Sequence, residues 1–122
     1  QKCMDELKQM LMNAELTNSP RIFFEGAKFA VAQMVQRAVA YTESYNANPT
    51  VVRSINNELE KNGQKIMDII QKYEDVEEDS PEMMEDAKTM LQLSSGLYRI
   101  LESVAPANDE VMNSYKGLVS KA

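Results

Sequence analysis

The residues best suited to chemistry are scarce in this 122-residue sequence, which has no histidine, one cysteine and nine methionines. Without histidine the chain lacks the commonest general base, the commonest metal ligand and every Ser-His or Cys-His nucleophile. It also contains no Gly-rich phosphate loop and no paired cysteines. We therefore expect no catalytic residues, no cofactor and no enzymatic activity.

A dense acidic segment is one candidate for metal binding. Residues 73–86, with the sequence YEDVEEDSPEMMED, are rich in the carboxylates that bind Ca²⁺, but they lack the spacing and the Gly turn of an EF-hand. We interpret the segment as a solvated link between helices. Glu82, Glu85 and Asp86 would then lie at the positive N-terminal end of the following helix.

The methionines are a second candidate, because sulfur ligands bind Cu(I). One group comprises Met4, Met10 and Met12 with Cys3, and another comprises Met83, Met84 and Met90. Met10 and Met12 cannot share a helix face, since residues two apart point in different directions. We favour core filling or an adaptable Met-rich binding surface, and we assign no metal ligand.

Composition and charge favour one globular domain over residues 1–122. Hydrophobic residues make up 43% of the chain and charged residues 26%, and the net charge is −6. The 13 Lys and Arg residues are scattered, whereas nucleic-acid binding needs them clustered. We expect neither nucleic-acid binding nor a membrane span, because no apolar run is long enough to cross a bilayer.

The sequence begins with Gln1, so we expect that it has been processed or trimmed. Removal of a signal peptide would explain this, as would trimming of a longer chain. On this basis we favour export, to the periplasm or by secretion, over other locations. The single Cys3 fits a small apolar residue of the first helix, with pairing to another chain as the alternative.

Proline and capping residues mark the helices. Ser19-Pro20, Asn48-Pro49 and Ser80-Pro81 each place an N-cap residue before a proline at the first helical position, and Asn108-Asp109-Glu110 marks a further start. We predict helices over about residues 2–16, 20–45, 49–76, 81–104 and 109–120. Short links predict an all-α, antiparallel up-and-down bundle of three long helices plus two short terminal helices, which run in the direction of the third.

Two apolar stripes each carry one polar residue at the centre. The first stripe is Val52, Ile55, Leu59, Asn62, Ile66, Ile69 and Tyr73, and the second is Met83, Ala87, Met90, Ser94, Leu97, Leu101 and Val104. Folding the helices back on each other pairs Asn62 with Ser94, so we predict that they meet inside the bundle, hydrogen-bond and fix the register. Gly63 and Gly96 would allow close backbone approach of the helices, or a small kink, at this level.

The second helix is apolar on more than one face. Its main stripe is Phe23, Ala27, Ala30, Met34, Ala38, Tyr41 and Tyr45, while Ile22, Phe29, Val35 and Val39 lie away from that stripe. Several neighbours must bury such a helix. If the first and last helices do not cover Ile22, Phe29, Val35 and Val39, these residues form an interaction face.

The sequence therefore favours a non-enzymatic helical-bundle interaction module that binds a protein partner, or a second copy of itself, through apolar helix faces. One alternative is a carrier of a small ligand, with a cavity at the Asn62 and Ser94 layer and with Tyr41, Tyr98 or Tyr115 as polar neighbours. Another is an acidic or Met-based metal binder.

Overall fold

The computed structural model describes residues 19–105 and 109–121, which form five α-helices and no strand. They are α2 (Pro20–Thr42), α3 (Pro49–Lys72), α4 (Pro81–Leu93), α5 (Ser95–Glu102) and α6 (Glu110–Lys121). The predicted all-α class is confirmed for these ranges. The helix predicted over residues 2–16 lies outside them.

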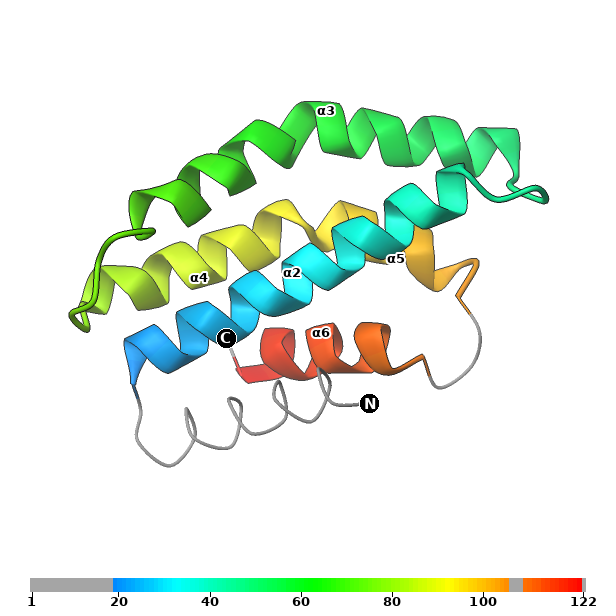
Figure 1. Cartoon of the computed structure of the whole chain (residues 1–122). Helices are drawn as coiled ribbons and strands as arrows, with labels where there is room; N and C mark the ends of the chain where they lie inside the picture. Colours follow the sequence, from blue (N-terminus) through cyan, green and yellow to red (C-terminus); the bar gives the residue numbers. More distant parts are fainter. Residues whose placement is uncertain (1–18, 106–108, 122) are drawn as a thin grey trace.

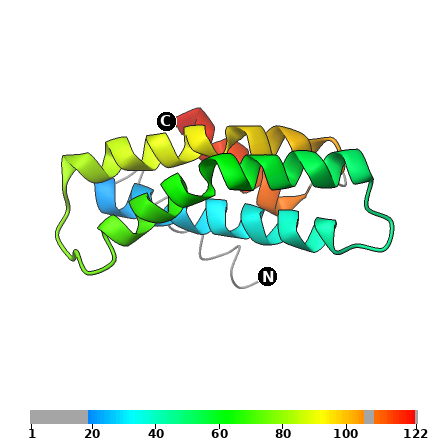
Figure 2. The ribbon, with the colours of Figure 1, turned by 90° about the horizontal axis from the view of Figure 1, so that it is seen from above.

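The helices are arranged as an up-and-down bundle (Figure 1). α2 and the α4–α5 pair run in one direction, and α3 and α6 run in the other. α2 makes its most extensive contacts with α4, and these two elements form the centre of the bundle. α3 lies on one side of this pair and α6 on the other, and the view from above shows α3 running obliquely over the bundle (Figure 2).

The predicted helix starts that fall within the described residues are confirmed. Ser19, Asn48 and Ser80 each accept a hydrogen bond from a backbone N–H in the first turn of α2, α3 and α4, and a proline occupies the first helical position in each case. Asp109 does the same for α6, where its Oδ1 accepts bonds from the N–H groups of Val111 and Met112.

α2 and α3 end earlier in the structure than the sequence predicts. α2 ends at Thr42 rather than residue 45, and Tyr45 is fully exposed. α3 ends at Lys72 rather than residue 76 because the following segment turns toward the start of α2. There Asp79 accepts bonds from the Arg21 N–H, at 2.6 Å, and from the Ser19 hydroxyl, and a longer α3 would not allow this contact.

The continuous helix predicted over residues 81–104 is wrong, because it is broken at Ser94 into α4 and α5. The Ser94 hydroxyl donates to the Met90 carbonyl at 2.9 Å, a local bond of the kind that bends helices. Tyr115, from α6, donates to the Leu91 carbonyl in the last turn of α4. A side chain inserted at this point is a recognised cause of a sharp kink.

The core confirms most of the predicted stripe of α4 and α5, which is buried from Met83 to Leu101. α2 contributes Ala27, Ala30 and Ala38, which are buried, and it makes its most extensive contacts with α4. α3 differs, since only Ile55 and Ile66 of its 24 residues are buried. None of the described helices combines the length and hydropathy needed to cross a membrane.

Candidate functional site: an apolar groove beneath α3

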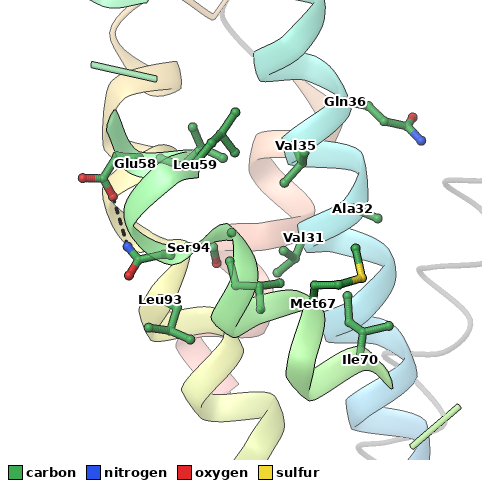
Figure 3. Close-up of a pocket in the computed structure, with 14 residues that line it drawn as sticks. Val31, Ala32, Val35, Gln36, Glu58, Leu59, Met67, Ile70, Leu93 and Ser94 are labelled. Atoms are coloured by element: carbon green, nitrogen blue, oxygen red, sulfur yellow. Dashed lines mark hydrogen bonds between the residues drawn. The ribbon is translucent and has the colours of Figure 1, made fainter. Parts of the chain in front are cut away.

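An apolar groove of about 400 Å³ lies between α2 and α3, with the junction of α4 and α5 as its floor (Figure 3). Its volume falls within the range of about 300–1,000 Å³ that is usual for small-molecule sites. The groove lies beside a core in which α2 and α4 are closely packed. The loose contact is therefore between α3 and the rest of the bundle.

The walls of the groove are mainly aliphatic. Val31 and Val35 point from α2 toward α3, and Met67 points from α3 toward α2 (Figure 3). α3 also contributes Leu59, Ile66 and Ile70, and the floor is formed by Leu93, Ser94 and Leu97. Met67 is 46% exposed, so the groove is open to solvent along this edge.

The groove exists because small residues face one another at one level of the bundle. Gly63 has no side chain, and a Cβ placed on it would meet no atom of the described residues within 4 Å. On the opposite side, Ser94 is small and its hydroxyl is engaged with its own helix. At this level the space between α3 and the junction of α4 and α5 is therefore left open, although Ile55 and Ile66 of α3 are buried in the core. The close approach predicted at Gly63 is not formed.

The hydrogen bond predicted between Asn62 and Ser94 is wrong. Both residues line the groove, but Ser94 is buried and Asn62 is partly exposed. The Asn62 amide instead donates to Glu58 Oε1, one turn earlier in α3, at 3.5 Å. The groove separates the two residues, so each forms hydrogen bonds with residues on its own side and not with the other.

Ser94 contacts α6 in place of α3. Its Oγ lies 2.9 Å from the Tyr115 hydroxyl, and Tyr115 is only 1% exposed. Burial raises the pKa of Tyr115 above its ordinary value. Tyr98 stacks on Tyr115 with ring centroids 4.9 Å apart. Of the three tyrosines proposed as polar neighbours of a cavity, Tyr115 contacts the groove floor, while Tyr41 and Tyr98 do not line the groove.

At Gly96 a side chain of α3, and not its backbone, makes the close contact. The Glu58 carboxylate of α3 lies directly over Gly96 of α5, where a Cβ would overlap it. Glu58 therefore reaches across from α3 to α5 at one side of the groove, and the dashed line in Figure 3 marks its bond from Asn62. Gln36 lies on the other side, on α2, and points away from α3 (Figure 3).

Hydrogen bonds hold α3 at both ends, on either side of the groove. Before α3, the Asn48 N–H donates to the Tyr41 hydroxyl at 2.9 Å. After α3, Lys72 contacts Glu82 and Asp86 of α4, and the Tyr73 hydroxyl donates to Asp86. The middle of α3 can thus remain loosely packed while its ends stay fixed.

The cluster at the end of α3 is electrostatically linked. Burial and the bond to Asp86 raise the pKa of Tyr73 to about 12. Burial disfavours the charged form of Asp86, but hydrogen bonds from Tyr73 and Lys72 outweigh it and lower the pKa of Asp86. The hydrogen bond from Lys72 also lowers the pKa of Glu82. This part of the acidic segment connects α3 to α4.

The predicted interaction face of α2 is divided between three environments. Ile22 and Phe29 are partly buried, and Phe29 packs against the core. Val35 lines the groove, and Val39 is 41% exposed. The second buried face of α2 is formed instead by Phe24 and Val31, which are each 1% exposed.

The candidate metal ligands do not converge in the described ranges. No group of three Asp or Glu side chains in residues 19–105 and 109–121 is arranged to hold a metal ion. Met83 and Met90 are buried in the core. Cys3, Met4, Met10 and Met12 lie outside the described residues.

The groove has the size and the lining of a binding site, and its residues come from four helices. Comparison with known proteins adds no function to this geometry: the chain matches no protein-family model, none of the curated proteins and none of the solved structures.

Proposed function

We propose that the protein is a non-enzymatic binding protein that holds a small apolar ligand in the groove between α2 and α3. The observation that carries the proposal is an apolar groove of about 400 Å³ next to an otherwise closely packed core. Removing apolar surface from water contributes about 25 cal/mol per Å², so a ligand that covers these aliphatic walls gains binding free energy.

The lining supports binding rather than catalysis. Glu58 is the single ionisable residue among those that line the groove. Nucleophilic catalysis by a serine needs a base beside the hydroxyl to activate it. The groove offers one carboxylate, one serine hydroxyl that is engaged in its own helix, and the amides of Asn62 and Gln36.

Filling the groove from Gly63 should weaken binding. A leucine at Gly63 would project into the space where a Cβ meets no described atom. We expect Gly63→Leu to weaken binding of the neutral fluorescent probe N-phenyl-1-naphthylamine by about tenfold or more, the loss that follows from occupying a pocket of this size. Fluorescence titration measures the affinity, and thermal unfolding shows that the variant is folded.

The matched control is Gln64→Leu, which adds the same side chain at the next position, where α3 is exposed. This variant should bind the probe as the wild type does. Equal affinities of Gly63→Leu and wild type would show that the probe binds elsewhere and would contradict the proposal.

A second candidate function is association with a protein partner or a second copy through α2. The observation behind it is that Val39 is 41% exposed on the helix for which the sequence predicts an interaction face. Sedimentation equilibrium should then show a dimer that Val39→Glu dissociates. A monomer over the whole concentration range would contradict the hypothesis of self-association.

A further inference from the structure

We propose that the groove prefers an amphiphile whose polar group is a protonated amine, with the hydrocarbon part along the aliphatic walls and the ammonium at Glu58. This inference rests on the proposed function and specifies the chemistry of its ligand. Two observations support it, which are the charge of the groove and the position of that charge.

The groove carries one negative charge and no positive charge. Glu58 is its one charged lining residue, and no Lys or Arg lines it. No Lys or Arg of the described residues forms a salt bridge with Glu58 either. A carboxylate amphiphile, such as a fatty acid, would place a second negative charge beside Glu58 with no cation to offset it.

The polar and apolar parts of the groove are separated along its length. Glu58 reaches over Gly96 at the α5 side, while Met67 and Ile70 lie toward the opposite end of the groove (Figure 3). A ligand with one polar end and one apolar end matches this distribution. Small molecules are oriented in apolar sites by a few placed polar groups of this kind.

The polar end offers acceptors. Glu58 Oε1 accepts from the Asn62 amide at a long 3.5 Å, which leaves Glu58 Oε2 and Asn62 Oδ1 with no hydrogen bond to any described residue. An ammonium group has three donors and no acceptor, so it can bond to both oxygens. Bonds between an ammonium and a carboxylate are also stronger than bonds between neutral groups.

The test compares octylamine, 1-octanol and octanoate, which share a chain length and differ in the charge of the polar group. Isothermal titration calorimetry at pH 7 should show that the wild type binds octylamine about tenfold more tightly than 1-octanol, as one charge-assisted hydrogen bond would give, and octanoate most weakly. Glu58→Gln keeps the size of the side chain and should bind octylamine and 1-octanol equally.

Glu60→Gln is the matched control, because Glu60 is exposed on the same helix and does not line the groove. It should retain the preference for octylamine, which excludes general attraction to an acidic protein. If Glu58→Gln also retains the preference, or if octanoate binds as tightly as octylamine, the inference is overturned while binding of 1-octanol still supports the proposed function. If the wild type binds none of the three compounds, both are overturned.

Discussion

Replacing Tyr115 by Phe should lower the free energy of unfolding by about 1–3 kcal/mol, the usual cost of leaving a buried polar group without its partner. The Tyr115 hydroxyl donates to the Leu91 carbonyl and lies 2.9 Å from Ser94 Oγ, and both Tyr115 and Ser94 are 1% exposed. Phenylalanine preserves the ring and its stacking on Tyr98, so the variant isolates the hydroxyl. Urea unfolding followed by circular dichroism measures the change.

The control is Tyr98→Phe, which removes the hydroxyl of the stacked neighbour. Its bond to Glu102, at 3.2 Å, is exposed, so we expect a change below about 0.5 kcal/mol, as is usual for surface substitutions. Equal losses in the two variants would contradict the role assigned to the hydroxyl of Tyr115 at the break between α4 and α5.

The same variant should change the dependence of stability on pH. Burial raises the pKa of Tyr115, so the folded state keeps this proton to a higher pH than the unfolded state does. The corresponding stability is complete below about pH 10, the ordinary value for Tyr, and is lost as the pH rises through the raised pKa of the folded state. Tyr115→Phe should therefore show a shallower loss of stability above pH 10 than the wild type.

Replacing Asp109 by Ala should lower the free energy of unfolding by about 2 kcal/mol. Losing an N-cap costs about 1 kcal/mol, and here the carboxylate accepts from two N–H groups of α6 and also pairs with Arg37 of α2. The Asp109 side chain is 5% exposed, which limits screening of the pair on its side, while Arg37 is 41% exposed. Thermal and urea unfolding both measure this loss.

Ser80→Ala is the comparison for Asp109→Ala, because Ser80 caps α4 through one N–H group and forms no ion pair. We expect it to cost about half as much, near 1 kcal/mol. Asp109→Asn, which can keep the cap but loses the charge, should fall between the two. A loss for Asp109→Ala no larger than that for Ser80→Ala would show that Arg37 contributes nothing.

Local signals in the sequence were sufficient to predict where α2, α3, α4 and α6 begin and most of the residues of α4 and α5 that are buried. Each start depends on residues adjacent in the chain, such as Ser80 and Pro81, so it could be predicted without knowledge of the fold. The burial of Met83, Ala87 and Met90 follows from their helical spacing.

The groove depends on contacts between helices, which spacing alone does not specify. The apolar stripe of α3 predicts a closely packed helix, yet Leu59 and Ile69 are only partly buried. Leu59 borders the space that is left beside Asn62 and Gly63. The sequence signal for the groove was a pair of small residues, Gly63 and Ser94, at the same level of two helices. The break at Ser94 could not be predicted from neighbouring residues, because it involves a contact with Tyr115, which is 21 residues further along the chain.

The most direct test of binding in the groove is the methyl NMR signal of Met67 during titration with 1-octanol. Met67 lines the groove, whereas Met83 and Met112 are buried elsewhere and are 1% and 5% exposed. Binding in the groove predicts a saturable shift of the Met67 signal, assigned with Met67→Leu, while the signals of Met83 and Met112 stay in place. A Met67 signal that does not move, or equal shifts of all three, would contradict the account.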